Sequence, residues 1–203
     1  MAEFQNTIDL LGDDVVVTSL LDRLITEIKD NVVTKIGKNT FYLCENLVSV
    51  NFPNVTDILD EAFSNCYKLA NVELPNVVNA GFKTFNTCPA LNNVSLPKLK
   101  TVPESFLTGC SLDVVDLGSA TNIKGSAFSS NSKFATLILR SNTMCSLSNT
   151  SAFTLTPFSA NGKCGTVYVP QALITEYQNA TNWSTLYAGG TCNFVAIEGS
   201  EYE

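Results

Sequence analysis

The feature that most constrains the fold of this chain is a unit of about 22 residues that recurs five times, a period within the range of known solenoid repeats. Its clearest marker is a phenylalanine that returns at a nearly constant interval, with the third interval one residue shorter than the others: Phe41, Phe63, Phe85, Phe106 and Phe128. Further apolar residues follow each phenylalanine at six, nine and eleven positions. Self-similarity at a fixed short period is typical of a solenoid, in which each unit buries its apolar side against its neighbours.

Each unit combines two local patterns. Its end alternates apolar and polar residues, which predicts a strand with one buried face, and in three units a proline ends that strand: Pro53, Pro75 and Pro97. The stretch A-F-x-x-C-x-x-L places apolar residues three apart, which predicts a short helical or 3-10 turn on the opposite side. We expect parallel strands near residues 49–52, 71–74, 93–96, 114–117, 136–139 and 166–169.

The consensus I-x-x-x-A-F-x-x-C-x-x-L-x-x-V-x-L-P resembles the BspA-like subfamily of leucine-rich repeats. The best copy covers residues 58–75, and the resemblance as a whole covers 36–142. The fifth copy departs from the pattern, because Asn131 stands for cysteine and Arg140 for proline. The resemblance implies an α/β fold: a right-handed solenoid with one parallel sheet.

We predict one solenoid domain over residues 1–203, with an N-terminal cap (1–35), five repeats (36–142) and an irregular segment with a C-terminal cap (143–203). Solenoid ends need caps because the last coils would otherwise expose their core. A capping helix is expected over 14–25, with an apolar side: Val17, Leu20, Leu21, Leu24 and Ile28. The alternative is a helix that drives oligomerisation, and the oligomeric state stays open.

The C-terminal cap is expected to follow an irregular stretch over 143–166. A strand and proline return at 167–170, residues 171–187 form a helix, and 194–197 form a last strand. The helix would turn four apolar residues to the core: Leu173, Ile174, Tyr177 and Trp183. The acidic tail from Glu198 onward is expected to be loose.

The composition argues against several kinds of chemistry. The chain has no histidine, which removes the commonest general base and metal ligand. A net charge of -7 and only two arginines argue against nucleic acid as a partner. No apolar run approaches the ~18 residues of a membrane span. We therefore predict no catalytic, cofactor-binding or metal-binding residue.

The seven cysteines fall into two groups. Cys44, Cys66 and Cys88 recur at one repeat position, and a spacing of a whole repeat does not suit a metal site, whose ligands come in close pairs. We interpret them as a ladder of buried thiols. For Cys145, Cys164 and Cys192, a disulfide in the C-terminal cap stays open.

The side chains that the predicted strands turn outward form the predicted binding face. Its residues are Asn51, Glu73, Ser95, Asp116, Ile138, Tyr168 and Val114. The face is polar toward the N-terminus and apolar toward the C-terminus, and a cluster of exposed apolar groups can mark a binding site. The alternative is that residues 143–166 fold over the apolar part and bury it.

The resemblance implies a non-catalytic protein- or glycan-binding module, with bacterial cell-surface adhesion or host interaction as its role. The first residues show no secretory signal, and the short chain also looks like repeat proteins among phage and prophage tail genes. An intracellular scaffold is the third alternative. Of these locations, the outside of a cell or the surface of a particle is favoured.

Overall fold

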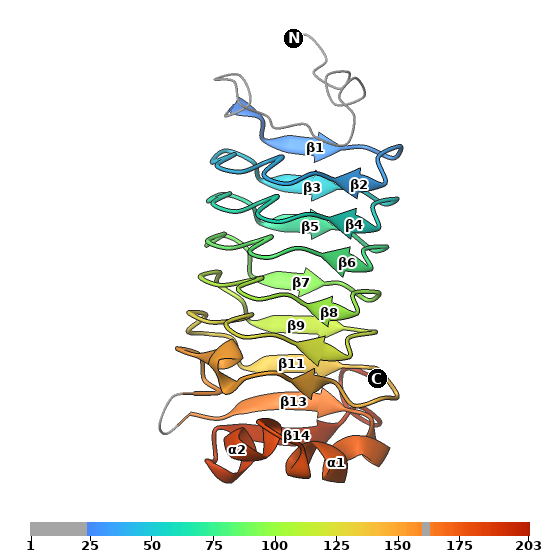
Figure 1. Ribbon diagram of the computed structural model, residues 1–203, viewed down its shortest axis with the longest axis vertical. Coiled ribbons are helices and arrows are strands. Elements are labelled where there is room, and N and C mark those ends of the chain that lie inside the picture. Colours follow the sequence, from blue (N-terminus) through green and yellow to red (C-terminus); the bar gives the residue numbers. More distant parts are fainter. Residues whose placement is uncertain (1–23, 160–162) are drawn as a thin grey trace.

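The computed structural model describes residues 24–159 and 163–203, and it shows a parallel-stranded solenoid of about six turns with little helix (Figure 1). A main row of strands runs along the stack. It consists of β1 (Glu27–Lys29), β3 (Ser49–Asn51), β5 (Asn71–Glu73), β7 (Asn93–Ser95), β9 (Val114–Leu117), β11 (Thr136–Leu139), β13 (Gly165–Val169) and β14 (Cys192–Ala196). The six strands predicted from the sequence are confirmed to within one residue at each end.

A second row of two-residue strands accompanies the first. It consists of β2 (Lys35–Ile36), β4 (Asp57–Ile58), β6 (Asn79–Ala80), β8 (Thr101–Val102), β10 (Asn122–Ile123) and β12 (Ser146–Leu147). Both rows pair in parallel, and both divide at the same level, between β5 and β7 and between β6 and β8. Equivalent residues of successive repeats lie opposite one another, as Val50 and Val72 do, so each repeat position becomes a column along the stack.

The columns inside the coils form the core. The rings of Phe41 and Phe63 stack with centroids 5.1 Å apart, and those of Phe63 and Phe85 lie 5.2 Å apart. Beside the rings, the thiol of Cys66 donates a hydrogen bond to the carbonyl of Phe41 at 3.1 Å, and the thiol of Cys88 donates to that of Phe63 at 3.2 Å. The cysteine ladder is therefore buried, as predicted, and the thiols of Cys66 and Cys88 also tie their coils to the preceding ones.

The turns that carry these phenylalanines are not the 3-10 turns expected from the sequence. Most coils instead place a non-glycine residue with positive φ on each side of the ring, such as Glu61 (φ 57) and Asn65 (φ 62) around Phe63. A right-handed helical turn cannot contain left-handed residues. A 3-10 helix replaces this turn in the last coil, at η3 (Thr150–Phe153).

The fourth copy has a different alignment from the one predicted. The backbone N–H of Phe85 donates to the carbonyl of Phe106, whereas that of Leu107 donates to Ala127 and that of Phe128 to Ala152. Leu107 therefore occupies the phenylalanine position, and Phe106 the alanine position before it. The Phe85 and Phe106 rings consequently meet edge-on, at 77°, rather than stacked.

This alignment makes Cys110 the fourth member of the cysteine ladder, and its thiol donates to the carbonyl of Phe85 at 3.3 Å. The coil is one residue shorter than the others because a single residue separates Cys110 from Leu112, where the earlier copies have two, as between Cys88 and Leu91.

Residues 143–159 continue the stack rather than interrupt it. Leu147 of β12 lies in register with Ile123 of β10, and the Phe153 ring stacks on Phe128 at 5.7 Å. The irregular segment expected here is thus a longer sixth coil. The solenoid also begins earlier than expected, since Ile28 is not on a helix but in β1, opposite Val50. The predicted helix over 14–25 lies, except for its last two residues, outside the described residues.

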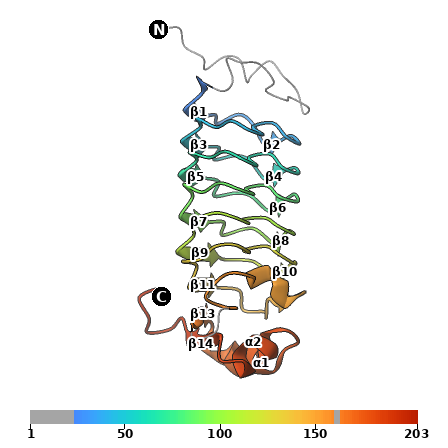
Figure 2. The ribbon, with the colours of Figure 1, turned by 90° about the vertical axis from the view of Figure 1, so that its left-hand side faces the viewer.

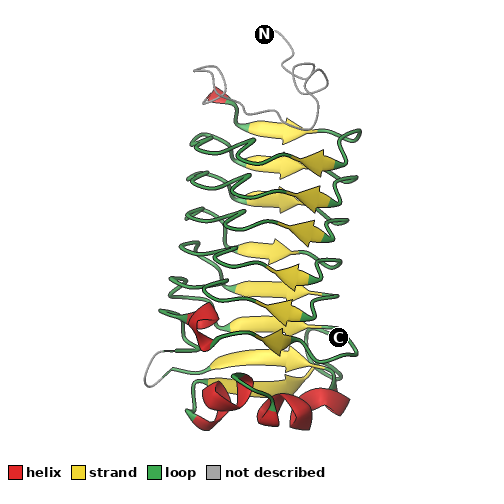
Figure 3. Ribbon diagram, viewed as in Figure 1, coloured by secondary structure: helices red, strands yellow, loops and turns green. Residues whose placement is uncertain are grey.

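A strand–helix–strand unit closes the C-terminal end (Figure 3). After β13 come η4 (Gln171–Leu173), α1 (Ile174–Asn179) and α2 (Trp183–Ala188), and then β14 returns parallel to β13. The helix predicted over 171–187 is therefore broken, and Asn182 at the break has a φ of 66°. The indole N–H of Trp183 donates to the carbonyl of Cys145 at 2.8 Å, and the Tyr177 hydroxyl accepts from the Cys145 N–H at 2.8 Å.

Candidate binding face on the solenoid

The predicted binding-face residues lie in two columns on the outer side of the main row. One column contains Asn51 opposite Glu73, then Ser95 opposite Asp116, which continues through Ile138 to Tyr168. Val114 belongs to the neighbouring column, between Asn93 and Thr136. The structure thus places all seven predicted residues on one face, but it divides them into an open part and a covered part.

The open part of the face is polar. The side chains of Asn71, Glu73, Asn93 and Ser95 are exposed on β5 and β7, whereas Val94 between the last two is buried. The side-chain amide of Asn51 donates a hydrogen bond to the Glu73 carboxylate of the next coil. At the N-terminal edge, Lys29 and Glu27 of β1 form an ion pair at 2.7 Å. These groups offer donors and acceptors on a backbone that the parallel ladder holds in place.

The apolar part of the face is covered by the C-terminal tail, residues 198–203. Ile138 is only 2% exposed although it lies outside the core cluster. The Tyr202 ring meets that of Tyr168 edge-on, with centroids 4.7 Å apart. Figure 2 shows the C-terminus on the outer side of the main row, at the level of β11 and β13. The tail is therefore not loose as expected, and it, rather than residues 143–166, covers the apolar patch.

Arg140 connects this tail to the sheet. Its guanidinium donates to both carboxylate oxygens of Asp116 at 2.9–3.0 Å and, through Nη1, to the backbone carbonyl of Tyr202 at 2.7 Å. Sequence reasoning included neither Arg140 nor Tyr202 in the face. The sequence does set Arg140 apart, because it stands where a proline ends the strand in the first three repeats.

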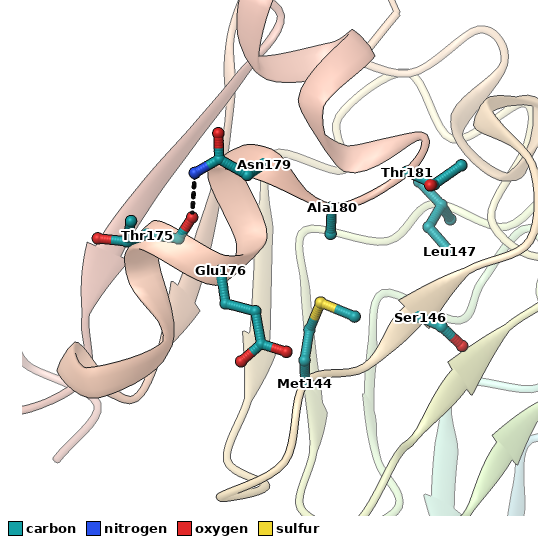
Figure 4. Close-up of a pocket in the computed structure, with 8 residues that line it drawn as sticks. All are labelled: Met144, Ser146, Leu147, Thr175, Glu176, Asn179, Ala180 and Thr181. Atoms are coloured by element: carbon teal, nitrogen blue, oxygen red, sulfur yellow. Dashed lines mark hydrogen bonds between the residues drawn. The ribbon is translucent and has the colours of Figure 1, made fainter.

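A separate groove lies between β12 and the helices of the C-terminal cap (Figure 4). Its volume is about 790 Å³, and Met144, Ser146 and Leu147 line one side while Glu176, Asn179 and Thr181 are among the residues on the other. The Asn179 amide is engaged with the carbonyl of Thr175 at 2.7 Å. Glu176 is the one acidic side chain among the lining residues in the part of the chain that the structure describes.

The cysteines form no disulfide in the structure, and Cys164 is exposed while the other six are buried. Burial raises the pKa of the Cys110 and Cys145 thiols to about 12. These buried thiols are therefore protonated at neutral pH and are poor nucleophiles. Within residues 24–159 and 163–203, no group of three or more Cys, Asp or Glu side chains could hold a metal ion. No helix in this described part is long and apolar enough to cross a membrane.

Parallel coils, a core of repeated apolar columns and an outward polar face define a leucine-rich-repeat solenoid. Residues 24–156 match the sequence model of the BspA-type leucine-rich repeat region, in six copies. This match covers more than half of the chain, and the chain therefore belongs to the BspA-type leucine-rich repeat family. A comparison with curated protein sequences finds no match.

Several solved structures are similar to this chain. A leucine-rich cell surface protein from Faecalibacterium prausnitzii is 22% identical with a TM-score of 0.40, over 58% of this chain and 44% of that one. A leucine-rich repeat protein from Bacteroides ovatus is 18% identical with a TM-score of 0.42, over 86% and 43%. The pneumococcal vaccine antigen PcpA is 13% identical with a TM-score of 0.49, over 85% and 41%. The chain spans less than half the length of each.

Proposed function

We propose that this chain is a non-catalytic module that binds a protein or glycan on the outer face of its main row of strands. The observation that carries this proposal is the contrast between the two faces of the same strands. Val94 and Leu96 are buried, whereas Asn71, Asn93 and Ser95 are exposed. The exposed residues form an ordered polar surface that the packing of the coils does not require.

Such a surface suits a polar ligand. Amide and hydroxyl side chains both donate and accept hydrogen bonds, so they match the hydroxyls of a glycan or the backbone of a protein segment. Within each of the two sheets of the main row, the parallel ladder fixes their spacing along the stack before any ligand arrives. A preformed site loses little conformational entropy on binding, which favours affinity.

We further propose that the module acts outside the cell, in adhesion or host interaction. This part of the proposal rests on membership of the BspA-type family and on the surface role that the resemblance implies. The acidic sequence pI of about 4.6 supports partners other than nucleic acid or anionic lipid.

The experiment measures binding of the purified chain to immobilised mucin, fibronectin and collagen. Asn71→Lys with Asn93→Lys changes the open face at two adjacent strands of the main row. Asn79→Lys with Thr101→Lys adds the same charge on β6 and β8 of the second row and serves as the matched control. We expect the first pair to weaken binding to at least one surface by tenfold or more, and the control pair by less than twofold.

Two results would contradict the proposal. In the first, the unaltered chain binds none of the surfaces above the level of a denatured sample. In the second, the two double variants weaken binding equally, which would place the contact away from the main row.

A further inference from the structure

The outer face of the main row turns from polar to apolar at the strands that the C-terminal tail contacts. The column that is polar from Asn51 to Asp116 becomes apolar at Ile138 and Tyr168. The position after the strand, a proline in the first three copies, becomes Arg140. The stacking of coils does not require these changes, since Ile138 is buried but does not belong to the core cluster. The apolar residues and the arginine at these positions are instead typical of a surface that binds another polypeptide segment.

The tail shows what this surface receives. The Tyr202 ring packs on Tyr168, and the backbone carbonyl of Tyr202 accepts from Arg140. Ser200 shapes the tail, because its hydroxyl donates to the carbonyl of Ile197 at 2.7 Å and accepts from the N–H of Tyr202 at 3.1 Å. A short turn thus presents an aromatic ring and a carbonyl together.

The tail is attached to the solenoid by few contacts. Glu198, Gly199, Glu201 and Glu203 are all exposed, and the residues of the tail lie outside the core cluster. The Arg140 side chain that holds the tail is itself partly exposed. Segments with few buried apolar contacts open at a low free energy without global unfolding. The tail can therefore leave the face while the coils stay folded.

The Arg140 guanidinium makes a polar contact with the tail. Arg140 is the cation that meets the tail, and a guanidinium carries five N–H donors, so it can bind an acceptor while it stays paired with Asp116. Tyr202 is flanked by Glu201 and Glu203. A segment that presents a tyrosine ring together with a backbone carbonyl therefore matches both the apolar part of the patch and Arg140.

We propose that Ile138, Arg140 and Tyr168 form a peptide-binding site for a turn-forming segment with a tyrosine, and that the chain's own tail occupies this site as a displaceable cover. This inference rests on the proposed function, because both use the outer face of the main row. It concerns a different part of that face and a different ligand, so the two can fail separately.

The test uses a fluorescent peptide with the sequence of residues 197–203 and measures its binding by anisotropy. Binding is compared between the full chain, a chain that lacks residues 199–203, and the full-length variant Tyr202→Ala. The truncation keeps Glu198, whose carboxylate accepts from the N–H of Gln171 at 2.9 Å. Tyr187→Ala, which alters an exposed tyrosine on α2, is the matched control.

We expect the truncated chain and Tyr202→Ala to bind the peptide at least tenfold more tightly than the full chain does. A tethered tail has an effective concentration of about a millimolar, so it competes strongly with free peptide. Tyr187→Ala should behave as the unaltered chain. Arg140→Gln in the truncated chain, or alanine in place of the peptide's tyrosine, should weaken binding at least tenfold.

The proposal is overturned if the peptide binds neither the truncated chain nor Tyr202→Ala. It is also overturned if the full chain binds the peptide as tightly as they do. Thermal melting of each variant accompanies the binding curves, and Tyr202→Ala keeps the test decisive if the truncated chain does not fold.

Discussion

The side-chain oxygen of Asn131 accepts a hydrogen bond from the backbone N–H of Leu112 at 3.3 Å, across two successive coils. In full-length coils the equivalent N–H has a partner in its own coil, as when Leu91 donates to the carbonyl of Cys88 at 3.0 Å. The fourth coil lacks one residue after Cys110, and Asn131 in the fifth coil supplies the missing acceptor. The asparagine also donates to the carbonyls of Leu107 and Phe128, both at 2.8 Å.

Replacement of Asn131 by cysteine, the consensus residue, should therefore destabilise the chain. We expect the free energy of unfolding to fall by about 1–3 kcal/mol, because a buried backbone N–H loses its acceptor. Urea unfolding measures the change. An alanine inserted between Ser111 and Leu112 restores the usual coil length. In a chain with this insertion, Asn131→Cys should lower the free energy of unfolding by less. Equal costs in both backgrounds would show that Asn131 does not compensate for the short coil.

The sequence predicts the strands well because the repeat period and the alternation around Val50, Val72 and Val94 are both regular. It misplaces the fourth copy because the pair Phe106–Leu107 offers two apolar residues for one position, and only the backbone hydrogen bonds distinguish them. Period alone does not locate a deletion inside a unit.

The covered part of the binding face could not be predicted for a related reason. The outward direction of Ile138 and Tyr168 follows from strand alternation alone. The return of Tyr202 onto Tyr168 is a contact between distant segments, and no local pattern encodes it. The acidic composition of the tail suggested solvent exposure, whereas Arg140 and the apolar patch hold it in place.

Leu96→Asp should abolish cooperative folding. Leu96 is fully buried in the core, and an unpaired carboxylate there carries a large desolvation cost. Circular dichroism during thermal melting would show the loss of a sharp transition. Asn93→Asp places the same group at an exposed position of β7 and should change stability by no more than about 0.5 kcal/mol. A normal melting curve for Leu96→Asp would contradict the register of β7.

Tyr177→Phe should weaken the attachment of the C-terminal cap. The Tyr177 hydroxyl is the acceptor for the backbone N–H of Cys145, and both residues are buried. Leaving that N–H without a partner should lower the free energy of unfolding by about 1–3 kcal/mol in urea titration. Tyr187→Phe removes an exposed hydroxyl from α2 and should be neutral. Similar effects of the two variants would argue against the Cys145 contact.

Thiol labelling at pH 8 should distinguish one cysteine from the other six. Cys164 is exposed and the rest are buried, so a chromogenic disulfide reagent should modify one thiol per chain quickly and the others only after unfolding. Cys164→Ala should remove the fast phase. Fast modification of two or more thiols in the folded chain would show that the cap or the ladder opens readily.

Alkaline pH should destabilise the chain through its buried thiols. Burial raises the pKa of Cys110 and Cys145 from an ordinary 9.0 to about 12, so between these values the folded state holds protons that the unfolded state has released. Stability is then fully present below pH 9 and falls above it, by up to about 1.4 kcal/mol per pH unit for each such thiol. Urea unfolding at pH 8, 9 and 10 measures the slope. Cys110→Ala and Cys145→Ala should each reduce the slope. A slope that neither variant alters would assign the alkaline loss of stability to other groups.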